Sequence, residues 1–144
     1  MGMGAGLSVL LSAIGAGIGI GLSGPAIAGA GVERPEVMLK TFIATILAEA
    51  LAIYGLVVGL LSVLVFGVNP QLTIEKSTRI FAAGLTMGAA ALGSGFGIGA
   101  SGSAMASATA EKPGIFSRAV ISLILAEALA IYALVTALLL VFTG

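Results

Sequence analysis

The sequence predicts an all-α membrane protein with four transmembrane helices, arranged as two tandem hairpins of the same orientation. Of its 144 residues, 59% are hydrophobic and only 8% are charged, whereas soluble domains carry about 25% charged residues. The apolar residues fall into four long runs, which gives the number of helices. An internal repeat then divides the four helices into two hairpins.

The four runs give the helices in order. Residues 1–32 and 80–110 contain no charged residue, and residues 41–74 and 119–144 contain a single glutamate each. A membrane-spanning helix needs about 20 apolar residues, so each run is long enough for one span and too short for two. We expect helices near residues 5–31, 37–66, 80–108 and 116–143.

The segments between these runs carry most of the polar residues. Their sequences are GVERPEV at 31–37, GVNPQLTIEKSTR at 67–79 and TAEKPG at 109–114. Each contains a proline, as is typical where helices end. The first and third segments are short enough to be tight hairpin turns.

The basic residues predict the orientation. Arg34, Lys40, Lys112 and Arg118 flank the two short turns, whereas only Lys76 and Arg79 lie on the other side. Because cytoplasmic loops are enriched in Lys and Arg, the short turns are expected in the cytoplasm and both termini outside.

The internal repeat has an offset of 78 residues. Residues 15–66 align with 93–144 without a gap, and 27 of those 52 positions are identical. This agreement indicates a duplicated hairpin, with residues 1–72 as the first copy and 73–144 as the second. Since each copy has two helices, both enter the membrane in the same direction, which excludes an inverted-repeat transporter.

Several functions are excluded by composition. The chain has no Cys and no His, and its six basic and six acidic residues balance, so we expect no disulfide, no imidazole or thiolate metal site and no nucleic-acid partner. Two GxGxxG matches lie inside predicted spans, where a dinucleotide cannot bind. We therefore expect no catalytic residue, no metal and no cofactor, and the lack of a basic segment before the first span argues against a cleaved signal peptide.

Glycine alternates with other residues in the first helix of each repeat, in GAGIGIG and GSGFGIG. On a helix these glycines form interleaved GxxxG pairs, which let neighbouring backbones approach closely. One interpretation is a single tight helix pair. The other, which the wide extent of the small-residue surface favours, is the crowded inner wall of a ring, packed through Gly15, Gly17, Gly19, Gly21, Gly93, Gly95, Gly97 and Gly99.

The nine residues ILAEALAIY occur twice and place Glu49 and Glu127 inside apolar runs, at the same expected depth. An ionised carboxylate costs several kcal/mol at the centre of a bilayer, so such a glutamate is neutral when it faces lipid and ionised only beside a cation or water. It can therefore load and release a proton. The alternative is a protonated glutamate that only bridges two helices, but its recurrence in two diverged repeats favours ion carriage.

The order of these motifs resembles one family. A hairpin of small residues, the turn ERPE and then LAEALAIYGLVV are similar to the proteolipid of rotary ATPases, the c or K subunit of the membrane rotor, and the duplicated form resembles the archaeal and vacuolar type. Eukaryotic vacuolar rings typically lack the acid of the first hairpin, so the presence of both acids resembles archaeal or bacterial relatives.

The resemblance implies a non-catalytic subunit of a rotary ATPase or ATP synthase. It implies a ring of many copies in the lipid bilayer, in the cell membrane if the source is prokaryotic, with Glu49 and Glu127 as ion carriers. It also implies two kinds of partner, a stator membrane subunit that supplies a counter-charge and central-stalk subunits. The stalk would contact the two short turns through Glu33, Arg34, Glu111 and Lys112.

The residues near the two acids favour a proton over sodium. Sodium-binding members of the family use a glutamine on the preceding helix and a hydroxyl beside the glutamate, but here Gln71 lies in a loop, the positions near Ile20 and Ile98 are apolar, and alanine follows each acid. Tyr54 and Tyr132, five residues beyond the acids, match a family tyrosine that can hydrogen-bond the carboxyl. Alternatively they are interfacial anchors. A sodium-coupled ring remains the nearest alternative.

Two other classes compete with the rotor. A small four-helix cation or multidrug exporter is expected to carry one acid in its first helix and aromatic residues around a pocket, whereas these acids lie in helices two and four. A passive pore or structural assembly needs only the glycines. Particle size separates a ring from a dimeric exporter.

Overall fold

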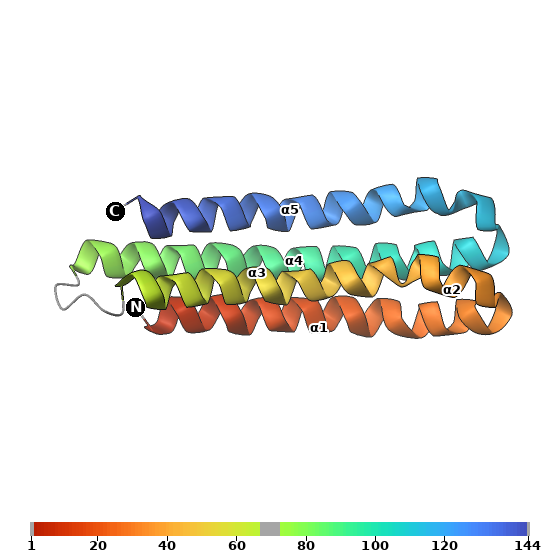
Figure 1. The fold of residues 1–144 in the computed structure, drawn as a ribbon, viewed down its shortest axis with the longest axis horizontal. Helices are drawn as coiled ribbons and strands as arrows, with labels where there is room; N and C mark the ends of the chain where they lie inside the picture. The colour runs from red at the N-terminus through yellow and green to blue at the C-terminus, as the bar shows by residue number, and fades with distance from the viewer. Residues whose placement is uncertain (1, 67–72, 144) are drawn as a thin grey trace.

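The computed structural model describes residues 2–66 and 73–143, which form an elongated bundle of long helices lying side by side (Figure 1). The helices are α1 (Gly2–Glu33), α2 (Pro35–Thr41), α3 (Ile43–Phe66), α4 (Ile74–Glu111) and α5 (Phe116–Phe142), with a 3-10 turn at Pro113–Ile115 before α5. In these residues four helical segments are long and apolar enough to cross a membrane, with α2 and α3 together forming one of them. The predicted all-α class with four spans is confirmed.

The two hairpin turns end the preceding helices in the same way. Arg34 and Lys112 each precede a proline and have extended backbones, with φ and ψ of −142° and 92° at Arg34 and −137° and 91° at Lys112. The residue before a proline avoids the helical region because its backbone would clash with the proline ring. Both turns lie at one end of the bundle, and the two described termini lie at the other (Figure 1).

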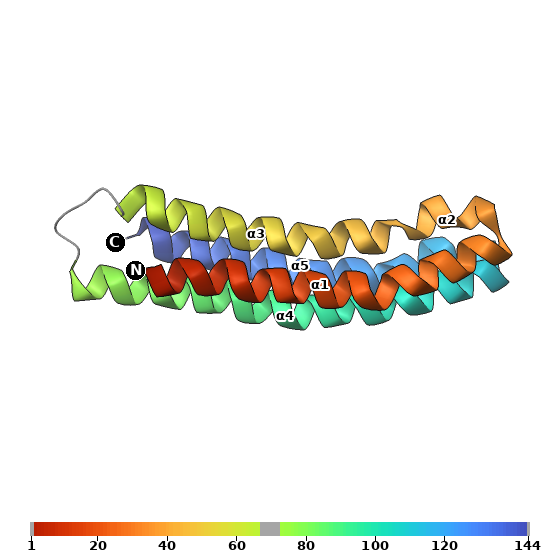
Figure 2. The same ribbon diagram turned by 90° about the horizontal axis from the view of Figure 1, so that it is seen from below.

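The second predicted helix, near 37–66, differs from the structure because it is divided at Phe42 into α2 and α3. The Thr45 hydroxyl donates to the carbonyl of Phe42 at 2.8 Å, and the Thr41 hydroxyl donates to the carbonyls of Val37 and Met38 at 3.1 and 3.0 Å. Hydroxyls that bond to carbonyls of the preceding turn bend helices. Figure 2 shows α2 offset from the line of α3.

The third predicted helix, near 80–108, is longer in the structure. α4 begins at Ile74, where the backbone N–H of Lys76 donates to the Thr73 hydroxyl at 3.3 Å, and it continues to Glu111. An N-cap of this kind satisfies one of the free amides of the first turn. α4 therefore extends beyond the apolar run at both ends.

The packing is centred on α1 and α4, which make the most extensive contact of any helix pair in the described residues. α3 packs on α1 and α5 packs on α4, and Figure 2 shows α1 and α4 along one side of the bundle with α3 and α5 on the other. At the centre, a Cβ placed on Gly95 would overlap the carbonyl oxygen of Gly15, and one on Gly15 would overlap that of Ala91. The glycines thus allow the two backbones to touch, which is the role that GxxxG patterns have in membranes.

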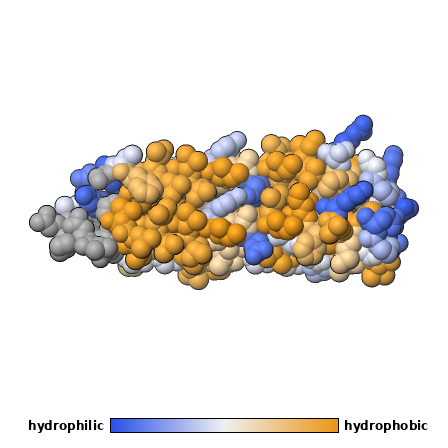
Figure 3. Space-filling model, viewed as in Figure 1, coloured by the Kyte–Doolittle hydropathy of each residue, from blue (hydrophilic) through white to orange (hydrophobic). Residues whose placement is uncertain are grey.

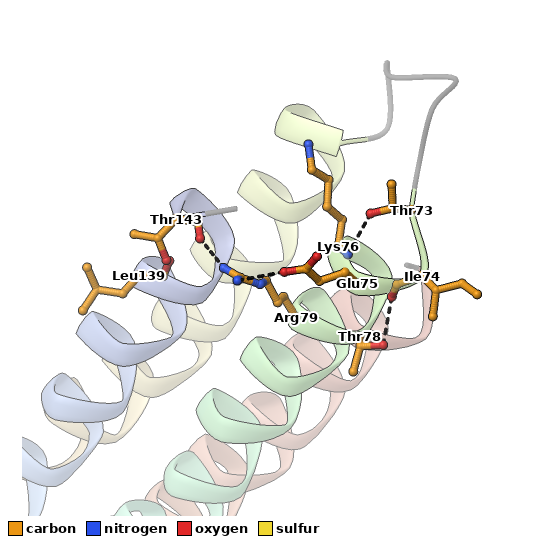
Figure 4. Close-up of polar contacts among 8 residues, drawn as sticks. All are labelled: Thr73, Ile74, Glu75, Lys76, Thr78, Arg79, Leu139 and Thr143. Carbon is orange, nitrogen blue, oxygen red and sulfur yellow. Dashed lines mark hydrogen bonds and ion pairs between the residues drawn. The ribbon is translucent and has the colours of Figure 1, made fainter.

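The surface has the distribution expected for a bilayer. A broad hydrophobic band covers the middle of the molecule, and hydrophilic residues gather toward its ends (Figure 3). At the end that carries the termini, Arg79 near the start of α4 donates to Glu75 at 3.0 Å and to the carbonyl of Thr143 just after α5 (Figure 4). The bond to Thr143 joins α4 to the end of α5 outside the apolar band, and the bond to Glu75 lies within α4.

Candidate ion-carrying site

Glu127 lies near the middle of α5 and is bonded to a tyrosine of the other hairpin. The Tyr54 hydroxyl, from α3, donates to Oε1 of Glu127 at 2.5 Å. Glu127 is only 5% exposed. The bond therefore forms where α3 and α5 approach each other, and it joins the two repeats at the depth of the acid.

The second carboxyl oxygen of Glu127, Oε2, is buried and has no hydrogen-bond partner among the described residues. A carboxylic acid has one O–H donor, whereas a carboxylate has only acceptors. In an apolar span the neutral acid is the less costly form, because an ionised carboxylate leaves water at a cost of several kcal/mol. One oxygen of this site is thus fixed by Tyr54, and the other can hold or give up a proton.

Glu49 has the same local sequence but different surroundings. It lies near the middle of the span formed by α2 and α3, and its side chain is exposed on the surface of the bundle. Tyr132, the repeat equivalent of Tyr54, is 66% exposed. The structure therefore brings Glu127 and Tyr54 together, and it leaves Glu49 and Tyr132 without each other.

Three residues decide whether the acids have ligands for sodium: Thr45 beside Glu49, and Ile20 and Ile98 on the preceding helices. Thr45, one turn before Glu49, uses its hydroxyl proton on the carbonyl of Phe42. Ile98 is fully buried and Ile20 is 40% exposed. The basic residues that the structure describes lie at the ends of the helices or in the turns, so none of these cations lies at the depth of the acids. Gln71 lies outside the described residues.

The predicted ring-packing glycines divide into two groups. Gly15, Gly19, Gly95 and Gly99 are buried in the contact between α1 and α4. Gly17, Gly21 and Gly93 have no atom within 4 Å of an added Cβ, and Gly97 has only the Cβ of Ala126, at 3.1 Å. Within the described residues, four of the eight glycines therefore pack between α1 and α4.

The residues predicted to face the central stalk lie together at one end of the molecule. Glu33 and Arg34 belong to the first turn, Glu111 and Lys112 to the second, and all four are exposed. Arg34 lies 3.9 Å from Glu36, an exposed ion pair that contributes little to stability. These side chains are open to contact by a partner.

A protein-family model that describes the C subunit of ATP synthase matches residues 3–62 and again residues 81–140. The chain belongs to this family. The two matches fall on the two hairpins, and together they cover most of the chain. The family model therefore covers α1 and α3 once and α4 and α5 a second time.

Members of this family with similar sequences are proteolipids of V-type proton ATPases. The 16 kDa proteolipid of the V-type proton ATPase of Homo sapiens is 40% identical over 138 residues, which cover 96% of this chain and 88% of the human protein. The corresponding protein of Nephrops norvegicus is 37% identical, covering 94% and 86%, and that of Ascaris suum is 37% identical, covering 96% and 86%. The resemblance to vacuolar-type rotary ATPase proteolipids is confirmed.

One property of the site was missed from the sequence. Two identical nine-residue motifs predict two equivalent sites, but in the chain one acid is covered and the other is open. The motif itself carries no signal for this difference, because its nine residues are identical in the two hairpins.

Proposed function

We propose that this chain is the rotor-ring proteolipid of a V-type rotary ATPase and that it moves protons by reversible protonation of Glu49 and Glu127. The observation that carries the proposal is the Glu127 carboxyl, buried in the middle of a spanning helix and held by Tyr54 at 2.5 Å. The similarity to proteolipids of V-type proton ATPases supports the same assignment and does not favour an exporter.

The site explains how a proton is carried. A neutral carboxyl can pass through the lipid-facing part of a circuit, and an ionised one needs a cation or water beside it. Since the described part of this chain has no cation at that depth, the counter-charge comes from a stator membrane subunit. Moving one charge through 100 mV is worth about 2.3 kcal/mol, so ATP-scale work requires several carboxyls acting in succession.

The rest of the molecule fits the same role. The hairpins 1–72 and 73–144 act as two units with one carrier each. The short turns face the cytoplasm, where Glu33, Arg34, Glu111 and Lys112 meet the central stalk, and both termini lie outside. Catalysis belongs to partner subunits, and this chain is a non-catalytic part of the membrane rotor.

The decisive experiment replaces each carrier by its neutral isostere in the complete reconstituted ATPase. Glu49→Gln and Glu127→Gln are each expected to reduce ATP-driven proton uptake to the background level, since an amide cannot load and release a proton. Glu75→Gln, which removes an exposed acid at the start of α4, serves as the matched control and leaves uptake unchanged. Normal uptake in either carrier variant, with the complex intact, would refute the role of that residue.

The preference for protons is tested by carbodiimide labelling of the intact ring at fixed pH. A sodium site needs several oxygen ligands to replace the water shell, whereas Tyr54 is the hydrogen-bond partner that the described residues give to the Glu127 carboxyl. We expect millimolar sodium to leave the labelling rates of Glu49 and Glu127 unchanged. Protection of either residue by sodium would show that the site binds that ion.

A further inference from the structure

Tyr54 lies beside a hydrogen bond between the two helices of its own hairpin. The Ser8 hydroxyl, on α1, donates to the carbonyl of Gly55, on α3, at 2.9 Å. Ser8 is fully buried, and Gly55 directly follows Tyr54 in the chain. The bond therefore joins α3 to α1 at the residue next to the tyrosine that donates to Glu127.

The backbone of α3 comes very close to α1 at Gly55. A Cβ placed on Gly55 would overlap the Cβ and Oγ of Ser12 and would lie 2.6 Å from the carbonyl oxygen of Ser8. Ser12 is fully buried, like Ser8 one turn before it. Small residues allow membrane helices to approach in this way, and a hydrogen bond between them adds to the contact. The position of α3 is therefore fixed by α1 both sterically and by a hydrogen bond.

The bond from Ser8 differs from those of the other hydroxyls inside the spans. The hydroxyls of Ser23, Ser62 and Thr136 donate to carbonyls one turn earlier in their own helices. Away from the ends of the bundle, two side-chain hydrogen bonds join different helices of the described residues, and they meet at consecutive residues of α3. Ser8 of α1 donates to Gly55, and Tyr54 donates to the carboxyl on α5.

The second hairpin does not repeat this contact. With the offset of 78 residues, the equivalents of Ser8 and Gly55 are Thr86 and Ala133. Ala133 carries the Cβ that Gly55 lacks, and the Thr86 side chain has no hydrogen bond among the described residues. The bond is thus absent from the hairpin of Tyr132, although the two tyrosines lie in identical motifs. It is therefore not a general requirement for packing the two helices of a hairpin.

The bond between Tyr54 and Glu127 depends on the exact position of α3. The two oxygens are 2.5 Å apart, and hydrogen bonds between oxygens extend to about 3.0 Å. A displacement of α3 by about 0.5 Å away from α5 therefore takes the tyrosine to the limit of this range. Since α1 contacts α3 at the adjacent residue, it is well placed to prevent such a displacement.

From these contacts we propose that Ser8 is a positioning residue for the Glu127 carrier. Its bond to the Gly55 carbonyl holds α3 where the Tyr54 hydroxyl reaches the carboxyl. Thr86 provides no equivalent bond in the second hairpin, so Tyr132 is not held in this way. The two carriers are therefore supported differently, although their motifs are identical. The inference rests on the proposed function, in which Glu127 loads and releases a proton, and it adds a residue of α1 to that site.

Carbodiimide labelling of the intact ring at fixed pH tests the proposal. Ser8→Ala is expected to raise the labelling rate of Glu127 about threefold, the size of one average hydrogen bond between membrane helices, because a carboxyl released from Tyr54 is more open to the reagent. The rate of Glu49 in the same ring stays unchanged. Ser8→Thr, which keeps the hydroxyl, restores the parent rate, and Thr86→Ala, the matched control, changes neither rate. An unchanged Glu127 rate in Ser8→Ala would overturn the proposal.

A double-mutant cycle distinguishes positioning from a general structural role. Tyr54→Phe is expected to raise the Glu127 rate about tenfold, the size of one hydrogen bond to a carboxyl group. Adding Ser8→Ala to Tyr54→Phe then causes no further rise, because the serine acts through the tyrosine hydroxyl. A further rise in that background, or no effect of Tyr54→Phe, would overturn the proposal. If Ser8→Ala does not assemble, Ser8→Cys decides, since a thiol is a weak donor: a raised Glu127 rate supports the proposal and an unchanged rate overturns it.

Failure of this inference is distinct from failure of the proposed function. If proton uptake is lost in Glu127→Gln but Ser8→Ala leaves the labelling of Glu127 unchanged, the function is retained and the positioning role is lost. If labelling depends on Ser8 through Tyr54 but uptake survives Glu127→Gln, the positioning role is retained and the function of that residue is refuted.

Discussion

The sites of Glu49 and Glu127 share nine identical residues and differ in almost everything around them. Glu127 is 5% exposed and bonded to Tyr54, whereas Glu49 is exposed and Tyr132 of the same chain does not reach it. The difference arises from packing, because Glu127 lies where hairpin two contacts hairpin one, whereas Glu49 lies on a face of hairpin one that the described residues leave open. Identical local sequence thus produces two environments, and the position of each copy in the chain decides which one it has.

Equivalent glycines of the two hairpins also differ in their surroundings. Their substitution is expected to have the largest effect on stability. Gly95 and Gly17 are repeat equivalents, but an added Cβ overlaps the backbone of Gly15 at Gly95 and meets nothing at Gly17. Alanine favours a helix over glycine by about 0.5–1 kcal/mol, whereas overpacking a tight contact costs about 1–3 kcal/mol. Gly95→Ala is therefore expected to destabilise the single chain by about 2 kcal/mol, and Gly17→Ala to stabilise it slightly.

Unfolding of the dissociated chain in a denaturing detergent series measures this difference. Native gels of the assembled particle provide the second measurement, because Gly17→Ala is expected to weaken the contact between copies and to reduce the amount of full-size particle. Equal stability of the two variants in the dissociated chain would contradict the contact between α1 and α4. A full-size, fully stable particle in Gly17→Ala would contradict the predicted role of Gly17 in ring packing.

Much of the fold follows from the sequence because a membrane leaves few choices. Charge-free runs of more than about 20 residues have to satisfy their own backbone, so they form helices, and Pro35 and Pro113 end them where expected. The break at Phe42 was not predicted, because it depends on the Thr41 and Thr45 hydroxyls bonding to particular carbonyls. The early start of α4 depends in the same way on a cap from Thr73 outside the apolar run.

The candidate site was predictable in part for a related reason. An acid in an apolar run is visible in the sequence, and so is its recurrence. Which tyrosine reaches which acid depends on how the hairpins pack, and that follows from backbone contacts such as Gly15 against Gly95. GxxxG patterns indicate that two helices approach closely. Because the glycines alternate, however, several faces of the same helix could form that contact.

Substitution of the two tyrosines is expected to have the next largest effect on stability. Inside the chain Tyr54 donates to Glu127, and a hydrogen bond between membrane helices contributes about 0.6–1.7 kcal/mol. Tyr54→Phe is therefore expected to lower the unfolding free energy of the dissociated chain by about 1 kcal/mol. Tyr132→Phe, which removes an exposed hydroxyl, is expected to have no effect there. A loss of stability in both variants would mean that Tyr132 has a partner within its own chain.

The smallest expected effect on stability comes from removing a buried hydroxyl, and it is a gain in stability where those of Gly95→Ala and Tyr54→Phe are losses. Ser94 is 2% exposed, and its Oγ has no hydrogen-bond partner among the described residues. Its equivalent in the first hairpin is Ala16, which is 4% exposed, so the same place in the repeat accepts alanine. An unpaired buried hydroxyl costs about 1–3 kcal/mol by mutational data, and the loss of its small packing contacts offsets part of that. Ser94→Ala is expected to raise the unfolding free energy by about 0.5 kcal/mol, and Ala16→Ser to lower it. Destabilisation by Ser94→Ala in the dissociated chain would show that the hydroxyl is bonded there, and destabilisation only in the assembled particle would place its partner in another copy.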